Sequence, residues 1–415
     1  LILCKMNLEA GLTFSLLRNM MPYMPFICVA ALCMAVLNSL RVFAIPAMTS
    51  VLLNIVWILV LLVICPLTSD MFRKVHYLAW GILIAGIIQF LFQLPCMIRQ
   101  KVKPVPDFRW RSDPRIKKVF LLMGPAAVGM GVFQINTLID KFLAFWVSTW
   151  APAALSFCER LVYLPLGVFA TAMGTVLLPT FSRQTARDDA GAILKTLNTS
   201  LRSLMLITVP SAIGLFALAG PIVQLVFEWK GGMFDALSTE RTMRALMFLS
   251  PGLIVFSLHK IFVPVFYAHQ DTKTPVKIGI MAVVLNLVLN ITFILTWPFE
   301  YKHAGIALAT VLSSTVNAVI LGCIISARIG SPGWRSIGLS FLMFVISGLV
   351  MAFAVRAGYG YLLEFLVAKG FSGKVCQLLA VIMAICEGVV VYCVLVFILA
   401  RRDITNLIKK FIHRV

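Results

Sequence analysis

Charged residues are scarce in this sequence, and acidic ones most of all. Of its 415 residues only 13% are charged, and 36 Lys and Arg stand against 16 Asp and Glu. A soluble globular domain is nearer a quarter charged, whereas this chain is 61% hydrophobic with a mean hydropathy of +0.98. The hydrophobic residues form long uninterrupted blocks. This pattern excludes an ordinary soluble domain and indicates a protein that crosses a membrane many times.

Sequence patterns of metal binding and catalysis are also missing. The ten cysteines include no Cys-x-x-Cys pair, and most lie in apolar runs, where a thiol acts as a small hydrophobe. There is no phosphate-binding glycine loop, no HExxH and no nucleophile–base constellation. We therefore predict no enzyme activity and no cofactor beyond a coupling ion. The net charge of +20 does not indicate nucleic acid, because the basic residues sit in short loops between apolar runs.

About eleven apolar segments are long enough to span a bilayer, which takes roughly 20 helical residues. Prolines mark the ends or kinks of several, among them Pro165 and Pro251. The predicted fold class is therefore an all-α polytopic membrane protein. The approximate cores of the spans are Met21–Leu40, Ala47–Pro66, Tyr77–Met97, Val119–Ile139, Ala153–Leu178, Leu204–Val226, Ala245–Phe266, Val276–Trp297, Ala304–Ala327, Ile337–Val355 and Leu378–Ala400.

Lys and Arg are distributed unequally between the two sides of the membrane. If the first span runs from outside to inside, the inner segments hold about twice as many basic residues as the outer ones, which predicts a cytoplasmic C terminus. The loop Arg99–Lys118 carries much of this excess. It is predicted to be the main cytoplasmic connector, with contact to anionic lipid as a further interpretation.

A weak internal repeat indicates two lobes. Ile45–Ala47 opens the second span and Thr274–Val276 opens the eighth, while Gln89 and Asn317 take like positions in the spans that follow. Parallel repeats of this kind are typical of two-lobe transporters. If Gly124-Pro125 opens the second lobe, its counterpart in the first lobe can be placed at the same sequence separation as the pairs above. That position would lie before residue 1. We therefore expect about three N-terminal helices to be absent from this chain.

Six charged side chains lie inside or near the ends of predicted spans, where a charge at mid-bilayer costs roughly 2.5–3.5 kcal/mol on insertion scales. Each must pair, snorkel to the interface or line a wet cavity. Snorkelling is a sufficient explanation for the adjacent pairs Asp140–Lys141 and Glu159–Arg160. Lys260 lies deeper in its span, which favours a position in a cavity. Glu387 could bond a neighbouring helix. The six are Asp140, Lys141, Glu159, Arg160, Lys260 and Glu387.

Asn286 and Asn290 are spaced four residues apart, so both carboxamides face one side of a helix. With the Asp140 carboxylate and the Thr310 hydroxyl they could form an oxygen cage for a hard monovalent cation. Alternatively, each amide only links helices, a contact worth about 0.6 kcal/mol. Gly174, four residues after an alanine, predicts close packing of its helix.

The loop Phe266–Pro275, which reads FYAHQDTKTP, joins two spans. It resembles the corresponding loop of the MurJ (MviN) family of bacterial lipid II flippases, within the multidrug/oligosaccharidyl-lipid/polysaccharide (MOP) exporter superfamily. The sequences of short loops vary freely unless the loop has a function. A match in this loop therefore carries more weight than a match in an apolar run. Leu37-Asn38, followed by Phe43–Ala47, resembles the turn after the family's fourth helix.

A second segment resembles the family's eighth helix. It consists of Glu159–Leu161, Pro165–Val168 and Gly174–Pro179. An Asp-Arg pair is usual there, and Glu159 keeps the charge of the Asp. The resemblance covers nearly the whole chain, although the final two helices match only in hydropathy.

The resemblance implies fourteen helices in a full member, two lobes around a central cationic cavity, and a groove for the lipid tail. Residues 1–118 then hold the rest of the N-terminal lobe and the connector. Residues 119–330 form the six-helix C-terminal lobe, and residues 331–415 form two groove helices and a basic tail. The implied function is to flip lipid II across the bacterial inner membrane by alternating access, among the proteins of peptidoglycan synthesis.

The same resemblance implies a role for Arg160, and the mechanism that we expect from it gives roles to two further charged residues. Arg160 matches a cavity arginine that binds the pyrophosphate and sugar of lipid II. Lys260 would add a second positive charge, and Glu159 would hold Arg160 while the cavity is empty and compete with the phosphate for it.

Some members of the family carry a sodium site. Asp140, Asn286 and Thr310 can be matched to its ligands, whereas Asn290 replaces the usual Asp and removes one charge.

Two other functions are compatible with parts of the pattern. A related MOP exporter could be a drug/cation antiporter or a flippase for another polyprenyl-linked oligosaccharide, although a drug antiporter would prefer an acidic, aromatic cavity. A membrane glycosyltransferase usually needs a large outer loop with catalytic carboxylates. The longest outer loop expected here, Arg356–Val375, contains only Glu364.

Overall fold

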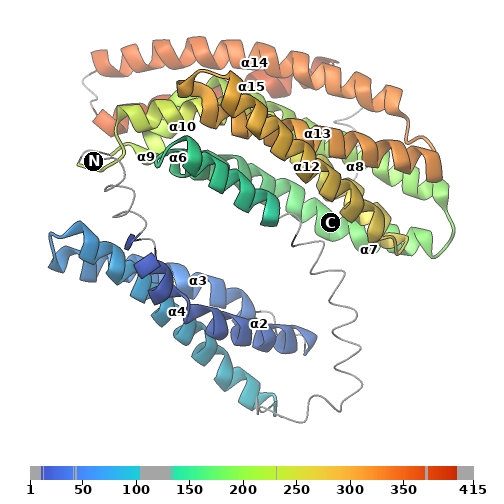
Figure 1. Ribbon diagram of the computed structural model, residues 1–415. Coiled ribbons are helices and arrows are strands. Elements are labelled where there is room, and N and C mark those ends of the chain that lie inside the picture. The colour runs from blue at the N-terminus through green and yellow to red at the C-terminus, as the bar shows by residue number, and fades with distance from the viewer. Residues whose placement is uncertain are drawn as a thin grey trace. The chain divides into compact units, whose positions relative to one another are not determined.

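The computed structural model describes residues 11–102, apart from 13, 41 and 43, and residues 131–399, apart from 132, 133, 230 and 370–372. Within these ranges the chain is helical and contains no strand. It divides into two compact units, Leu1–Ile116 and Lys117–Val415. The first is drawn in blue in Figure 1, and the second runs from green to red.

The first unit is a small helical cluster in which α2 and α3 both pack on α4. A Cβ at Gly86 of α4 would lie only 2.6 Å from the ring of Tyr23 on α2, so the missing side chain lets the two helices meet. The buried Gln89 amide donates to the Thr49 carbonyl of α3 at 2.9 Å, as expected for a polar group that links helices. The helices are α2 (Tyr23–Ser39), α3 (Ala44–Leu59, extended by two irregular turns to Leu67) and α4 (Met71–Arg99).

The second unit holds the remaining helices. Its described part opens with a helix over residues 134–147. A π-helical turn, Leu166–Thr171, joins α6 to α7 without a break. The helices that follow are α6 (Ala151–Pro165), α7 (Ala172–Thr185), α8 (Ala190–Ala217), α9 (Ala219–Phe227), α10 (Ala236–Leu249), α11 (Gly252–Ala268), α12 (Lys273–Thr296), α13 (Lys302–Arg328), α14 (Trp334–Ala368) and α15 (Gly373–Leu399).

Ten of the eleven predicted membrane spans have counterparts among the described residues, one of them with different bounds. Nine helices are long and apolar enough to cross a membrane, and α10 with α11 makes a tenth across a 46° bend. The bend falls at Ser250 and Pro251, where the sequence predicted a break. The remaining predicted span, Val119–Ile139, lies mostly outside the described residues. The chain is therefore a multi-pass all-helical membrane protein.

Two predicted boundaries are wrong. The span predicted at Leu204–Val226 is two helices, α8 and α9, and α8 begins already at Ala190. The outer loop expected at Arg356–Val375 is mostly helix, because α14 continues to Ala368 over 35 residues. At 1.5 Å per residue α14 is about 52 Å long, well beyond the ~30 Å hydrocarbon core, so its far end continues as helix where side chains can be polar.

Several of the scarce acidic residues serve as helix caps. The side chains of Asp70, Asp189 and Asp235 accept hydrogen bonds from backbone N–H groups at the starts of α4, α8 and α10. Such caps satisfy N–H groups that have no partner inside the helix. Three of the few acidic residues therefore stabilise the first turns of helices.

Small residues allow close packing in the second unit. A Cβ at Gly174 of α7 would lie 3.1 Å from the Lys260 carbonyl oxygen of α11, which confirms the predicted close approach. The long helix α14 lies along α15 and also packs on α8 (Figure 1). The Glu387 carboxylate of α15 is seated against the backbone of Gly358, where a Cβ would overlap it. Glu387 thus meets a neighbouring helix, as one of the predictions allowed.

Candidate functional site

The helix over residues 134–147 places two adjacent charged side chains in different surroundings. Successive residues of an α-helix point about 100° apart. Asp140 is therefore directed at α12 and α13, where it bonds Asn290 and Thr310, whereas Lys141 is directed at α6, where it meets Glu159. These two groups of contacts form the candidate site of the second unit.

The Asp140 carboxylate is the centre of a buried polar cluster. Asn290 Nδ2 donates to Asp140 Oδ1 at 2.7 Å, and Thr310 Oγ1 donates to Asp140 Oδ2 at 3.0 Å. Asn290 Nδ2 also lies 2.9 Å from Asn286 Oδ1. Asp140 is 8% exposed, and both asparagines are fully buried. The structure thus brings the four residues of the predicted cation cage into one cluster.

A fifth side chain, Asn136, belongs to the same cluster. Its Nδ2 lies 3.4 Å from Asp140 Oδ2, one helical turn away. With the Asn286 amide turned by 180°, its nitrogen lies 2.9 Å from Asp140 Oδ1 and its oxygen can accept from the Thr310 backbone N–H at 3.3 Å. The buried Asn290 Oδ1 has no hydrogen-bond partner among the described residues. The four-residue spacing between Asn136 and Asp140 is the sequence signal that could have included Asn136.

Lys141 forms the principal ion pair of the site. Its Nζ lies 2.9 Å from both Glu159 carboxylate oxygens and donates to Ser156 Oγ at 2.9 Å. The two charged side chains are 26% and 28% exposed. The expectation that Glu159 holds Arg160 is wrong for this structure, because adjacent residues of a helix do not face each other and Lys141 takes the carboxylate instead.

Arg160 lies exposed on α6 and, over the described residues, makes no ion pair. Its guanidinium carbon lies 5.7 Å from the centre of the Phe157 ring. Phe157 in turn packs on Phe227 and Phe234, at ring-centre distances of 4.7 and 5.2 Å. Lys260 is on another helix, α11, and is likewise exposed and without an ion pair in the described ranges. Two cations of the predicted substrate site are therefore available to an anion.

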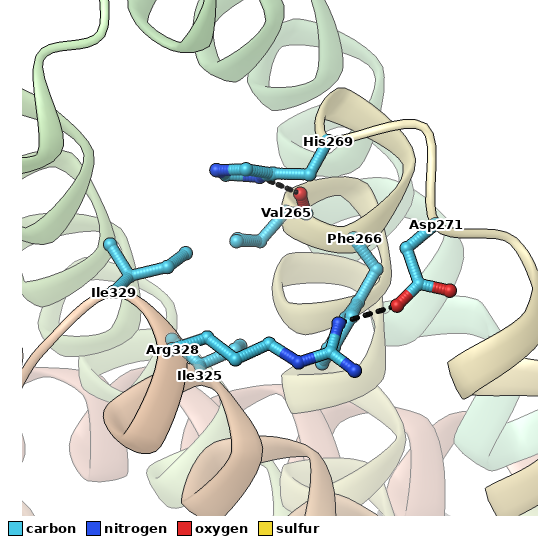
Figure 2. Close-up of a pocket in the computed structure, with 7 residues that line it drawn as sticks. All are labelled: Val265, Phe266, His269, Asp271, Ile325, Arg328 and Ile329. Carbon is cyan, nitrogen blue, oxygen red and sulfur yellow. Dashed lines mark hydrogen bonds and ion pairs between the residues drawn. The ribbon is translucent and has the colours of Figure 1, made fainter.

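The loop between α11 and α12 shapes a small pocket of about 160 Å³ (Figure 2). Arg328 Nη1 donates to Asp271 Oδ2 at 2.6 Å, while Thr274 donates to the same carboxylate through its backbone N–H and its hydroxyl, at 2.9 and 2.6 Å. Asp271 therefore ties the start of α12 to the end of α13. The pocket is lined by Val265, Phe266, His269, Asp271, Ile325, Arg328 and Ile329.

These contacts keep Asp271 ionised. Partial burial opposes the charge, but hydrogen bonds from Thr274 and Arg328, together with the Arg328 charge, outweigh it and lower the pKa of Asp271 to about 2. The polar loop that stood out in the sequence thus has a clear structural role.

Comparisons with known proteins agree with the resemblance seen in the sequence. A family model described as "Lipid II flippase MurJ" matches residues 4–381. The probable lipid II flippase MurJ of Vibrio cholerae is 37% identical over 306 residues, which is 74% of this chain and 56% of the relative. The corresponding protein of Haemophilus influenzae is 38% identical over 313 residues, 74% of this chain and 59% of the relative.

A solved structure of "Lipid II flippase MurJ, inward closed conformation" superimposes with a TM-score of 0.73 at 26% identity. It covers 94% of this chain and 75% of that one. By contrast, the chain spans only 56% and 59% of the length of the two curated relatives named above, which is less than two thirds. Helix pattern, loop sequence, family match and structural match all agree, and the chain belongs to the lipid II flippase MurJ family.

Proposed function

We propose that the full-length protein carries lipid II from the inner to the outer leaflet of the bacterial inner membrane by alternating access, with its C terminus in the cytoplasm. The observation that carries this proposal is Arg160, an exposed guanidinium in a membrane span without a carboxylate partner in the described residues. An unpaired charge in a span is costly unless it meets water or an anion. The planar donor fork of arginine suits phosphate oxygens, which lipid II presents in its pyrophosphate.

Lys260 supplies a second positive charge in this mechanism. The negative headgroup is neutralised in the cavity, and the lobes then rock to open it outward. Movement of the headgroup away from a negative cell interior is downhill by roughly 2.3 kcal/mol per charge per 100 mV. The reaction involves no covalent step, so it needs no nucleophile or acid–base pair. Other proteins of peptidoglycan synthesis would supply and consume the lipid.

The test uses the full-length gene in a bacterium depleted of its own lipid II flippase. Lipid II on the outer leaflet is measured by its accessibility to an added lipid II-cleaving toxin. We expect accessible lipid II with the native protein and its loss with Arg160→Ala at equal membrane levels. Arg160→Lys, which keeps the charge and loses the fork, should give an intermediate signal.

Two results would contradict the proposal in different ways. Full activity of Arg160→Ala would remove that residue from the transport path. No accessible lipid II with the native protein, despite its presence in the membrane, would favour a drug or another polyprenyl-linked oligosaccharide as substrate, and a drug-resistance assay would separate those two.

We also propose that sodium is a coupling ion and binds at the Asp140 cluster. The donor set fits a hard cation: a buried carboxylate, a hydroxyl and two amide oxygens, one of which, Asn290 Oδ1, has no partner in the described part of the chain. Asp140, Asn286, Asn290 and Thr310 would hold the ion. When bound, it would neutralise the single carboxylate of the cluster.

Thermal unfolding tests the ion site independently of transport. A ligand that binds only the folded state raises its stability in proportion to RT ln(1 + [L]/Kd). We expect sodium chloride to raise the Tm of the native protein above that in choline chloride of equal ionic strength. Asp140→Asn should remove the difference, whereas Asp271→Asn, a carboxylate outside the cluster, should keep it. An equal rise in Asp140→Asn would exclude this site.

A further inference from the structure

We propose that Lys141 is a positioning residue for anion binding, which holds the Glu159 carboxylate and so leaves Arg160 with an uncompensated positive charge. This inference rests on the proposed role of Arg160 in binding the phosphate of the lipid headgroup. It assigns a function to an ion pair that neither the sequence pattern nor the family match singles out.

The geometry commits Lys141 to Glu159. Its Nζ lies 2.9 Å from both Glu159 carboxylate oxygens, and its third bond, also 2.9 Å, goes to Ser156 Oγ. The Ser156 hydroxyl donates its only proton to the Pro152 carbonyl at 2.7 Å. Its oxygen is therefore directed as an acceptor for the ammonium. All three protons of Lys141 thus have acceptors on α6, about one turn or less from Arg160.

The neighbouring carboxylate does not compete for Lys141. Asp140 precedes Lys141 in the chain, but its two oxygens accept hydrogen bonds from Asn290 and Thr310 on α12 and α13. The two carboxylates nearest to Lys141 therefore have separate partners. Asp140 belongs to the polar cluster, and Glu159 belongs to Lys141.

Charge balance then gives the consequence for Arg160. The charges of Lys141 and Glu159 cancel locally, so Arg160, which lies over Phe157, remains as the net positive charge of this part of α6. Without Lys141, Glu159 would be a partly buried and unpaired carboxylate adjacent to Arg160 in the chain. In a low-dielectric span it would repel the same phosphate that Arg160 attracts.

The experiment measures binding of fluorescently labelled lipid II to the full-length protein in nanodiscs. We expect Lys141→Met to weaken binding about tenfold, which is near the lower end of the effects measured for close charge pairs. Lys141→Arg should bind like the native protein because it preserves the pair. The decisive variant is Lys141→Met/Glu159→Gln, which removes both charges and should restore affinity to within about twofold of native.

A merely structural role predicts the opposite for the double variant. If the pair only ties two helices together, Lys141→Met/Glu159→Gln should bind as weakly as Lys141→Met, since both lack the tie. That result, or native affinity in Lys141→Met, would overturn the inference.

Should Lys141→Met fail to fold, the charge-swapped Lys141→Glu/Glu159→Lys takes its place. It should bind at least as tightly as native, and tenfold weaker binding by this folded variant would overturn the inference.

Arg160→Ala separates this inference from the proposed function. If Arg160→Ala binds lipid II like the native protein, the phosphate contact itself is wrong. If Arg160→Ala is weak while Lys141→Met is unchanged, the phosphate contact stands and only the role of Lys141 is wrong.

Discussion

At the scale of single residues, several of the scarce acidic side chains in the described part of the chain make defined contacts. Asp140 organises the buried amide cluster, Glu159 pairs with Lys141, and Asp271 joins two helices at the loop. Unpaired carboxylates are expensive inside a membrane, and these three all have hydrogen-bond or ion-pair partners. Acid should therefore act on the protein through a small number of identifiable groups.

Asp271 gives a prediction for pH dependence. Its pKa is lowered to about 2 in the folded protein, against about 3.9 for an unperturbed Asp. Its contribution to stability is therefore fully present above about pH 4 and is lost as the pH falls towards 2. We expect Asp271→Asn to lower the Tm in detergent at pH 6, and the gap to native to shrink below pH 4. A gap that does not change with pH would show that the charge is not responsible.

At the scale of helices, glycine determines how closely two segments approach. Gly174 of α7 faces the Lys260 carbonyl of α11, and that oxygen is backbone, which cannot turn aside as a side chain can. The structure thus explains the glycine by a contact between two helices. Gly360 of α14 has open space at the corresponding point. Apart from its chain neighbours and the local backbone of its own helix, no heavy atom lies within 4 Å of the position that a Cβ would take.

The two glycines make a matched pair of substitutions. Gly→Ala in a helix interior gains roughly 0.5–1 kcal/mol when nothing is in the way. Gly360→Ala should therefore be neutral or stabilising. Gly174→Ala should cost about 1–3 kcal/mol, because the added methyl meets the carbonyl at 3.1 Å. Thermal unfolding in detergent measures both, and equal effects would mean that α7 and α11 do not approach as closely as the structure shows.

At the scale of the whole second unit, contacts between distant parts of the chain fasten one end of its bundle. Arg241 of α10 lies 3.9 Å above the Trp150 ring, and His303 of α13 meets the same ring edge-on at 4.8 Å. His303 Nε2 lies 2.8 Å from the Arg241 carbonyl oxygen. Because a carbonyl only accepts, Nε2 carries a proton and donates it to this oxygen. Trp150 thus joins segments that are far apart in the sequence.

Trp150→Leu tests this junction. It removes a cation–π contact and an aromatic pair, each worth about 0.5–2 kcal/mol, so we expect a loss of about 1–3 kcal/mol in unfolding free energy. Trp146→Leu is the control, since Trp146 is 76% exposed on the preceding helix. It should change the Tm little. Equal effects of the two substitutions would show that the ring contacts of Trp150 contribute nothing specific.

The fold class, ten of the spans and the family could all be predicted from the amino-acid sequence alone. A bilayer requires about 20 apolar residues per crossing, and each such stretch is visible without knowledge of the others. Asp140, Asn286, Asn290 and Thr310 could also be grouped in advance, because the four-residue spacing of the two asparagines directs them to one side of a helix and the family pattern supplies the other two.

The pairing of the charged groups, in contrast, became clear only from the packing of the helices. Glu159 is adjacent to Arg160 in the chain, yet it bonds Lys141, which is 18 residues away. The full length of α14 was not evident either, because a helix that leaves the bilayer no longer needs apolar residues. The composition of a segment reflects the solvent around it. Its partners on other helices depend on the direction of each side chain around the axis and on what packs opposite, which the sequence of one segment does not specify.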